Sequence, residues 1–317
     1  MELKIRKAAV LGAGVMGAQI AAHLAAAGVR TYLLDLSANE PPKDKKMAKA
    51  IGKNFRNAPA LVAIENLKKL KPSPLTSKSI LANIIPGNFD DDMSVLAECD
   101  WIVEAVVERL DIKKSMLSKI AEYARPEVPV TTNTSGLSMA SMAEDMPEHF
   151  TKKFFGTHFF NPPRYMKLLE IIPHHNSDME LVHSLSSWIE ANLGKGIVYT
   201  NDTINFIGNR IGVFTMMATL RHMDELGLNI ETVDALTGKL MGRPASATLR
   251  TMDVVGIDIF SHVAENVYKY DQKDPYREWF MSPEWIKNLI SKGHLGQKAG
   301  SKGAYMKSKD ERGIRRY

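Results

Sequence analysis

The sequence predicts an α/β fold, in which a doubly wound parallel sheet is followed by an all-helical C-terminal domain. Short apolar runs alternate with amphipathic stretches through the first half, a glycine-rich turn follows the first run, and only helical periodicity is found after Asn205. The 317 residues, 44% of them hydrophobic, can bury a sizeable core. We expect two domains, residues 1–202 and 203–317.

The first domain shows the alternation of a βαβ series. Its expected strands are Ala8–Leu11, Thr31–Leu34, Trp101–Val107, Val128–Thr132, Phe154–Phe160, Lys167–Ile172 and Ile197–Thr200. Its expected helices are Met16–Ala27, Asp111–Ala124, Ser138–Asp145, where Ser138 can cap the free N–H groups, and Met179–Leu193. Residues 40–82 interrupt this rhythm with a lysine-rich, mostly helical stretch, too long for a simple crossover, which predicts an inserted helical arm.

The second domain is expected to be helical throughout. The expected helices are Asn205–Leu226, closed by Gly227, then Glu231–Met241, Asp253–Tyr268 and a last one that begins at Ser282-Pro283-Glu284, with Ser282 as its cap. A polar, basic tail, Lys307–Tyr317, follows.

Composition excludes several classes of protein. The single cysteine, Cys99, cannot form an internal disulfide, and no apolar run of about 20 residues is present to span a membrane. The net charge of +5 comes from dispersed lysines, which indicate solvated helix faces rather than a nucleic-acid site. The adjacent His174 and His175 lack further ligands at metal spacing, so no metal is expected. We expect a cytoplasmic protein.

The strongest local motif is Gly12-Ala13-Gly14-Val15-Met16-Gly17, between an apolar strand and an alanine-rich helix. Gly12 permits a tight turn, Gly14 lets a pyrophosphate approach, and Gly17 lets helix and strand pack closely. Asp35 ends the second strand, where a carboxylate binds ribose hydroxyls and repels a 2′-phosphate. The motif predicts a Rossmann-type fold that binds NAD.

Two charged residues near the next strand are further candidates for cofactor contacts. Glu108 is expected at the carboxyl end of Trp101–Val107, which is the edge where ligands bind in such sheets, and Lys113 lies within one helical turn of it. For each residue, an ion pair in a loop is an equally good interpretation.

An acid–base pair is predicted from two neighbouring strands. His158 lies in an aromatic strand, and Glu170 lies in the middle of an apolar one, where a buried carboxylate needs a partner. A His158–Glu170 pair leaves the other imidazole nitrogen free to take a proton from a substrate hydroxyl, while the cofactor supplies the redox chemistry. Ser135, after the Val128–Thr132 strand, and Asn209 could hold the substrate, but both could equally be caps.

Together these residues resemble the 3-hydroxyacyl-CoA dehydrogenase family along nearly the whole chain. The matching segments are Gly12-x-Gly14-x-Met16-Gly17, Glu104-x-x-x-Glu108, Asn133-Thr134-Ser135, His158-Phe159-Phe160-Asn161-Pro162, Lys167-Leu168-Leu169-Glu170 and Asn209-Arg210. The resemblance implies His158 and Glu170 as the catalytic pair, with Ser135 and Asn209 contacting the substrate. The expected cofactor contacts are Gly12, Gly14, Val15, Met16, Gly17, Asp35, Glu108, Lys113, Asn133 and Asn161.

The resemblance also implies an acyl-CoA thioester substrate, oxidised in fatty-acid β-oxidation, an arm that touches coenzyme A, and a homodimer built by the helical domain. The segment Met241–Arg250 is longer and more basic than is usual in the family and resembles the branch that is fused to an enoyl-CoA hydratase-like domain, so a further C-terminal domain is a hypothesis. Two alternatives remain. One is a β-hydroxyacid dehydrogenase that acts on a free acid, and the other is a catalytically idle NAD-binding structural protein.

Overall fold

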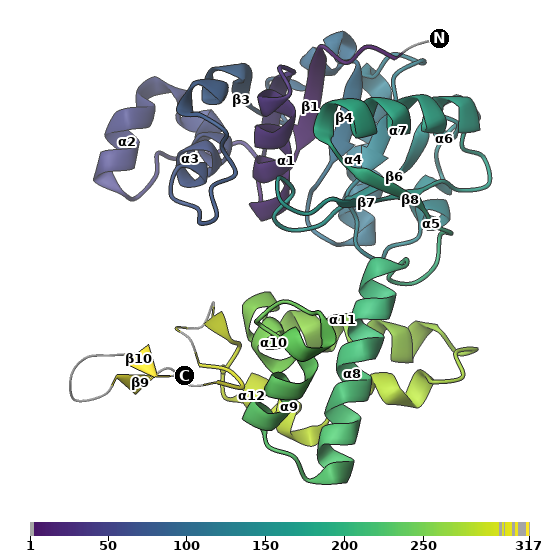
Figure 1. The fold of residues 1–317 in the computed structure, drawn as a ribbon. Helices are drawn as coiled ribbons and strands as arrows, with labels where there is room; N and C mark the ends of the chain where they lie inside the picture. Colours follow the sequence, from purple (N-terminus) through teal and green to yellow (C-terminus); the bar gives the residue numbers. More distant parts are fainter. Residues whose placement is uncertain (1–2, 298–299, 301, 306–307, 310–314, 317) are drawn as a thin grey trace. The chain divides into compact units, whose positions relative to one another are not determined.

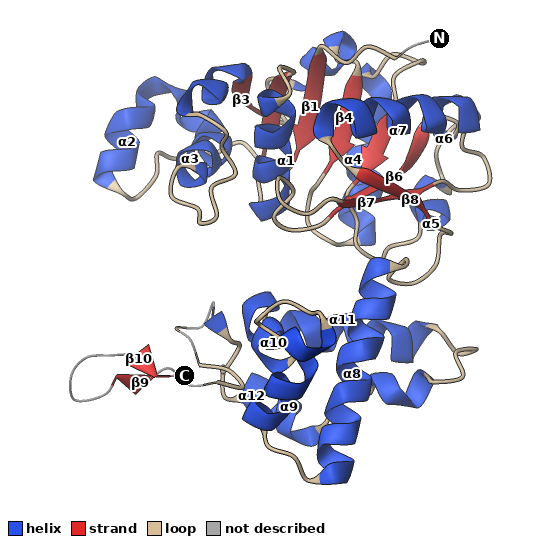
Figure 2. Ribbon diagram, viewed as in Figure 1, coloured by secondary structure: helices blue, strands red, loops and turns tan. Residues whose placement is uncertain are grey.

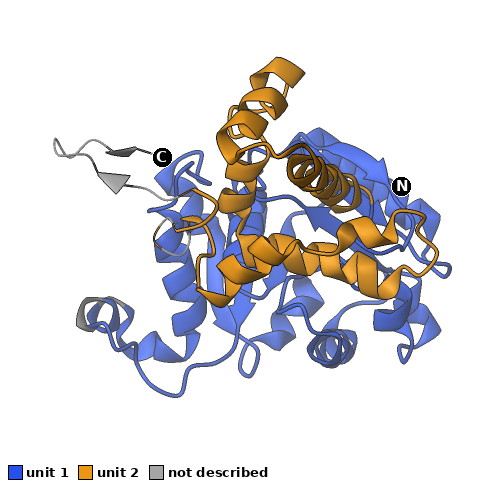
Figure 3. Ribbon diagram, turned by 90° about the horizontal axis from the view of Figure 1, so that it is seen from below, with its two compact units in different colours: residues 1–206 blue, residues 207–317 orange. Residues whose placement is uncertain are grey.

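The computed structural model describes residues 3–297, 300, 302–305, 308–309 and 315–316, arranged as two compact units. The first unit is Met1–Phe206 and the second is Ile207–Tyr317, as coloured in Figure 3. The expected boundary between residues 202 and 203 lies four residues earlier. Most of the basic tail Lys307–Tyr317 lies outside the described residues.

An eight-stranded sheet forms the centre of the first unit, with strand order β3-β2-β1-β4-β5-β6-β7-β8 (Figures 1 and 2). All neighbouring strands are parallel except β6 and β7, which are antiparallel. The strands are β1 (Lys7–Leu11), β2 (Arg30–Asp35), β3 (Ile84–Asn88), β4 (Trp101–Glu104), β5 (Val130–Thr132), β6 (Phe154–Phe159), β7 (Leu168–Ile172) and β8 (Gly196–Tyr199).

Helices cover both faces of this sheet, as the alternation of side chains along β1 shows. Ala8 and Val10 point into one buried cluster with side chains of α1, α3 and α7, whereas Ala9 and Leu11 point into the other with side chains of α4 and α5. The helices of this unit are α1 (Val15–Ala26), α2 (Lys45–Ile51), α3 (Ala58–Leu67), α4 (Leu110–Tyr123), α5 (Met139–Ala143), α6 (Glu148–Thr151) and α7 (Met179–Leu193), with 3-10 turns at Gly52–Asn57, Lys78–Asn83 and Met93–Glu98. The predicted doubly wound sheet is confirmed.

The expected arm corresponds to α2, the 3-10 turn Gly52–Asn57 and α3, which lie beside the β3 edge of the sheet in Figure 1. Strand β3 itself was not predicted, because Pro86 and Gly87 lie within it. Proline is tolerated there because β3 is an edge strand that pairs only with β2.

The strand expected at Trp101–Val107 ends earlier, at Glu104. The Val106 N–H donates to the Glu104 carboxylate at 2.6 Å instead of to a neighbouring strand, so the chain turns after Glu104. Glu108 therefore lies four residues beyond the strand, in the loop before α4, and its expected place at the strand end is wrong.

The second unit is helical, as predicted, apart from the two-residue strands β9 (Ser308–Lys309) and β10 (Arg315–Arg316). Its helices are α8 (Gly208–Leu226), α9 (Ile230–Thr237), α10 (Leu249–Val255), α11 (Ile257–Tyr270) and α12 (Glu284–Ser291), with 3-10 turns at Lys239–Met241 and Arg277–Phe280. No helix in the described part of the chain is both long and apolar enough to cross a membrane.

Four boundaries in this region differ from the prediction. The helix expected at Glu231–Met241 ends at Thr237, and a 3-10 turn follows it. The helix expected from Asn205 begins at Gly208, because Asn205 and Phe206 adopt left-handed backbone angles (φ 62° and 48°). The helix expected at Asp253–Tyr268 is divided into α10 and α11 by Gly256, whose φ is 107°. Ser282 does not cap α12, because its hydroxyl is hydrogen-bonded to that of Ser261 at 2.6 Å.

Candidate active site

A cleft of about 770 Å³ opens at the carboxyl ends of four neighbouring strands in the first unit. It lies where the strand order reverses between β1 and β4, which is where ligands bind in sheets of this type. The lining residues that follow β1, β2, β4 and β5 directly are Gly12, Leu36, Ala105 and Asn133. Val15, Met16, Asp35, Phe89, Glu108 and Ser135 also line it.

The glycine turn has the geometry that a pyrophosphate site needs. Gly12 has a φ of 106°, and a Cβ there would collide with the Ala105 carbonyl, while a Cβ on Gly17 would collide with the Gly12 carbonyl. No atom lies within 4 Å of the Cβ position of Gly14, which precedes the first turn of α1. Gly12 and Gly17 therefore allow close packing, and Gly14 leaves open space beside the free N–H groups of the helix.

Asp35 ends β2 and is fixed to the glycine turn. Its carboxylate accepts hydrogen bonds from the backbone N–H groups of Ala13 and Leu36, at 2.5 and 2.6 Å. These two contacts hold the carboxylate at the cleft wall, where its remaining lone pairs can accept ribose hydroxyls.

A buried ion pair lies beneath the cleft. Lys113 is 1% exposed, and its Nζ lies 2.9 Å from both carboxylate oxygens of Glu104, which is fully buried. The carboxylate also accepts the Thr132 hydroxyl at 2.6 Å. Lys113 is not among the residues that line the cleft, and its expected contact with the cofactor stays a prediction.

Glu108 fixes the loop that carries Ser135. Its carboxylate accepts hydrogen bonds from the Thr134 hydroxyl at 2.5 Å and from the Ser135 N–H at 2.8 Å, and it lies 3.4 Å from the Lys113 Nζ. The Ser135 side chain is exposed at the cleft. Glu108 thus positions a hydroxyl beside the expected cofactor position.

The predicted contact between His158 and Glu170 is present. The two residues lie opposite each other on the antiparallel strands β6 and β7, and the His158 Nδ1 lies 2.7 Å from a Glu170 carboxylate oxygen. His158 is 4% exposed, Glu170 is fully buried, and the imidazole packs against the rings of Phe160 and Phe206. A carboxylate at Nδ1 fixes the tautomer and leaves Nε2 for proton transfer.

Two asparagines connect this pair to the rest of the unit. Asn133 lines the cleft, and its side-chain oxygen accepts the Phe159 N–H at 2.9 Å, next to His158. The Asn161 side chain accepts a hydrogen bond from Gln19 of α1 at 3.1 Å. Asn209 lies in the first turn of α8 in the second unit, and its role stays a prediction.

Sequence reasoning missed the structural role of Glu104. The signal was available, since Glu104 stands in an apolar run just as Glu170 does, and a buried carboxylate requires a partner. The described residues contain no group of three or more histidine, cysteine or acidic side chains arranged to hold a metal ion.

The strand order and the cleft define the class: this is a Rossmann-type dinucleotide-binding protein. Comparison with known proteins narrows the class. Residues 7–203 match the family model "3-hydroxyacyl-CoA dehydrogenase, NAD binding domain", and residues 206–306 match "3-hydroxyacyl-CoA dehydrogenase, C-terminal domain". The chain belongs to the 3-hydroxyacyl-CoA dehydrogenase family, as the resemblance predicted.

Similar proteins agree with this assignment. The chain is 45% identical over 309 residues to a probable 3-hydroxyacyl-CoA dehydrogenase of Bacillus subtilis (strain 168), covering 97% of this chain and 39% of that protein. It is 40% identical over 315 residues to a protein of the same name from Deinococcus radiodurans, covering 99% and 86%. The structure of (S)-3-hydroxybutyryl-CoA dehydrogenase from Ralstonia eutropha is similar with a TM-score of 0.74 and 26% identity, covering 96% of this chain and all of that one.

Proposed function

We propose that the chain catalyses the NAD-dependent oxidation of (S)-3-hydroxyacyl-CoA to 3-oxoacyl-CoA in fatty-acid β-oxidation. The observation that carries this proposal is the buried His158–Glu170 pair, joined at 2.7 Å across β6 and β7. Such a pair supplies the general base that alcohol oxidation requires. Bound NAD would accept the hydride from the carbon that bears the hydroxyl.

Several groups at the cleft suit NAD. The open space at Gly14 suits a pyrophosphate at the start of α1, and the Asp35 carboxylate suits the adenosine ribose. Val15, Met16 and Asn133 line the same cleft. The family model that matches residues 7–203 is itself described as an NAD-binding domain.

His158 takes the hydroxyl proton at Nε2 in this proposal. Glu170 faces Nδ1 and stabilises the imidazolium that forms, because an opposite charge in a buried site favours the protonated ring. Ser135, whose N–H is held by Glu108, offers a hydroxyl to the substrate oxygen. Asn209 is assigned to the substrate by the resemblance alone.

Partners and location belong to the same proposal. We expect a cytoplasmic homodimer that associates through the helical domain, acts on acyl-CoA thioesters, and has the arm near coenzyme A. The chain spans 39% of the length of its Bacillus subtilis relative and 86% of that of its Deinococcus radiodurans relative, and a further, hydratase-like domain stays a hypothesis. The relatives share the dehydrogenase name, which supports the substrate class.

The proposal is tested by following NADH formation at 340 nm with purified protein, NAD and short- and medium-chain (S)-3-hydroxyacyl-CoA. His158→Ala should lower kcat by roughly a hundredfold or more, because general-base catalysis contributes about 10²–10⁴, while NAD binding is unchanged. His175→Ala removes an exposed histidine from the loop after β7 and serves as the matched control. Turnover of free 3-hydroxy acids instead of thioesters, or NAD binding without any turnover, would refute the proposal.

A further inference from the structure

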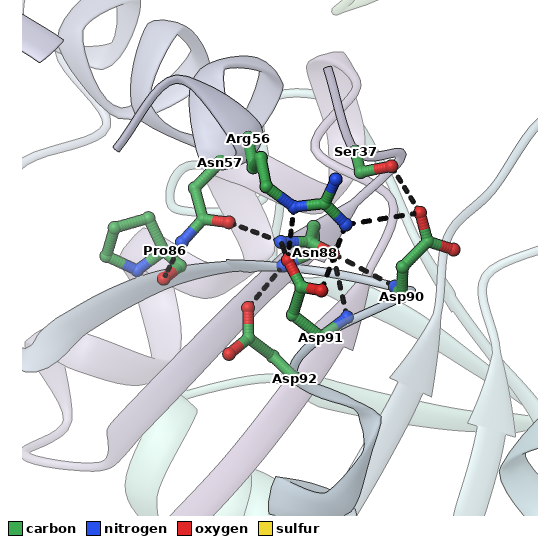
Figure 4. Close-up of polar contacts among 8 residues, drawn as sticks. All are labelled: Ser37, Arg56, Asn57, Pro86, Asn88, Asp90, Asp91 and Asp92. Atoms are coloured by element: carbon green, nitrogen blue, oxygen red, sulfur yellow. Dashed lines mark hydrogen bonds and ion pairs between the residues drawn. The ribbon is translucent and has the colours of Figure 1, made fainter. Parts of the chain in front are cut away.

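A cluster of polar side chains joins three segments of the first unit near the end of β2 (Figure 4). Ser37 comes from the loop after β2, Arg56 from the arm, and Asn88, Asp90 and Asp91 from the end of β3 and the turn after it. We call these five residues the rim cluster. Asn88 organises the turn, since its side-chain oxygen accepts the N–H groups of Asp90 and Asp91 at 3.0 and 2.9 Å.

The rim cluster adjoins the expected adenosine end of the cleft. Asp35, Leu36 and Phe89 all line the cleft, and the Phe89 N–H donates to the Asp35 carbonyl at 2.9 Å. Ser37 directly follows Leu36, and Asp90 directly follows Phe89. A phosphate on the ribose 2′-oxygen, which is the group that distinguishes NADP from NAD, would therefore approach this cluster.

Two side chains of the cluster, Arg56 and Ser37, could donate hydrogen bonds to a 2′-phosphate, but both already donate to aspartates. Arg56 forms a bidentate ion pair with Asp91, with Nε and Nη2 at 2.6 and 2.9 Å from the carboxylate oxygens, and lies 3.9 Å from Asp90. The Ser37 hydroxyl donates to the Asp90 carboxylate. An arginine near the ribose is the usual device for accepting a 2′-phosphate, and it needs its guanidinium free to do so.

The charge balance of the rim also disfavours a second phosphate. Asp90, Asp91 and Asp92 lie around Asn88 and Arg56 in Figure 4, and Asp35 ends the neighbouring strand, so four carboxylates share this region with the guanidinium of Arg56. The hydrogen bonds from Arg56 and Asn88 lower the pKa of Asp91, so this carboxyl stays ionised at neutral pH. Like charges within a few ångströms repel one another even near the surface.

We propose that Asp90 and Asp91 are specificity-determining residues that select NAD over NADP by keeping Ser37 and Arg56 from a 2′-phosphate. The inference rests on the proposed use of NAD and adds to it, because Asp35 is then only part of the discrimination. Replacing Asp35 alone leaves Arg56 neutralised and Ser37 occupied. Removing the two acids of the rim as well releases a ready-made phosphate site.

The test is a calorimetric titration of the purified chain with NADH and with NADPH, which measures binding and needs no catalysis. Asp35→Ser should weaken NADH binding and improve NADPH binding less than about threefold. Adding Asp90→Asn and Asp91→Asn should tighten NADPH binding by at least about tenfold relative to Asp35→Ser, because the guanidinium is then free for a charge-assisted bidentate contact. Arg56→Gln in this triple variant should abolish the gain.

A second acidic pair gives a matched control. Glu144 and Asp145 share the half-buried Lys114 at 3.0 and 2.8 Å, in the same two-acids-to-one-cation arrangement. Asp35→Ser combined with Glu144→Gln and Asp145→Asn should bind NADPH as Asp35→Ser does. An equal gain in this control would show that net charge alone is responsible and would overturn the proposal.

Other outcomes also decide the question. NADPH binding that is as tight in Asp35→Ser as in the triple variant, or a gain that survives Arg56→Gln, overturns the proposal. If the triple variant does not fold, the double variant Asp35→Ser with Asp90→Asn is used, because it keeps the Arg56–Asp91 pair and frees Ser37. This double variant should show a smaller gain in NADPH affinity than the triple variant. No gain in NADPH affinity would overturn the proposal. A wild-type chain that binds neither nucleotide would refute the proposed function instead.

Discussion

Glu104 and Glu170 are two fully buried carboxylates in the same sheet, and they differ in the base that each one meets. Glu104, at the end of β4, is held by Lys113 through both oxygens and also accepts the Thr132 hydroxyl and the Val106 N–H. Glu170, on β7, meets one ring nitrogen of His158. A lysine ammonium group only donates hydrogen bonds, whereas one imidazole nitrogen can donate while the other accepts a proton.

The difference separates a structural pair from the pair that we propose to be catalytic. The Lys113 ammonium group donates to the Glu104 carboxylate and to the Val106 carbonyl, and it lies close to the Glu108 carboxylate. These contacts stabilise the structure beneath the cleft. The contact between His158 and Glu170 uses the ring nitrogen Nδ1, and Nε2 is the nitrogen that takes the substrate proton in our proposal. We therefore expect loss of the first pair to cost stability and loss of the second to cost turnover.

The largest effect is expected from Lys113→Met, which leaves the Glu104 carboxylate buried without its counter-charge. Breaking one side of a buried pair costs about 3 to 5 kcal/mol, and we expect that loss in the free energy of unfolding measured in urea. Lys114→Met is the matched control in the next residue, where the lysine meets Glu144 and Asp145 at the surface, and its Tm should move by no more than about 2 °C. Equal Tm shifts in the two variants would contradict the structural role of Lys113.

A slightly smaller effect is expected from Glu170→Gln, and it should appear in turnover. The amide can keep a hydrogen bond to His158 but carries no charge to stabilise the imidazolium, so kcat should fall by roughly a hundredfold. The dissociation constant for NAD should change less than about twofold, since Glu170 does not line the cleft. Stopped-flow and steady-state assays separate the two quantities, and an unchanged kcat would show that Glu170 has only a structural role.

The two pairs also show what a sequence can predict. The His158–Glu170 contact was predictable because the two strands are consecutive, and neighbours in sequence often pair in a sheet. Glu104 carried the same signal, but its partner lies on the following helix, nine residues away. The sequence favoured a cofactor contact and a loop ion pair equally for Lys113 and did not point to Glu104. A charge in a helix's first turn does not by itself reveal which way its side chain points.

Local backbone geometry explains the elements that the sequence did not predict. Nothing in the apolar pattern indicates that Asn205 and Phe206 adopt left-handed angles that delay α8. The strand β3 contains a proline, which predicts a loop when only the local sequence is considered. The proline is tolerated because β3 lies at the edge of the sheet. The glycine turn was predictable in full because its constraints are steric and confined to a few residues.

A half-buried base, His23 on α1, sharpens the comparison because the charged groups that shift its pKa, among the described residues, are cations rather than carboxylates. Burial, and then the positive charge of Lys195, lower the pKa of His23 to about 4 from 6.5, and its Nε2 has no hydrogen-bond partner within the part of the chain that the structure describes. Between these pH values the unfolded chain binds a proton that the folded chain does not, so stability falls as the pH falls from 6.5 towards 4. At about pH 5 the loss should reach about 2 kcal/mol.

Urea unfolding at about pH 7 and pH 5 measures this effect, with His23→Met as the comparison. The loss in the free energy of unfolding between these two pH values should be smaller in His23→Met than in the wild type, by about 2 kcal/mol. His175→Ala is a control, because that side chain is exposed. If wild type and His23→Met show the same pH dependence, His23 is not the group that responds.

The smallest effect is expected at Lys7 and Glu98, a pair that is closer than Lys113 and Glu104 but lies at the surface. The Lys7 Nζ is 2.6 Å from a Glu98 oxygen, against 2.9 Å in the buried pair, and the side chains are 38% and 57% exposed. Water already solvates both charges, and ordering two long side chains offsets much of the attraction. Glu98→Gln should therefore shift the Tm by no more than about 2 °C at neutral pH, and less at high salt. A shift as large as that of Lys113→Met would mean that contact distance, rather than burial, determines how strongly these pairs stabilise the fold.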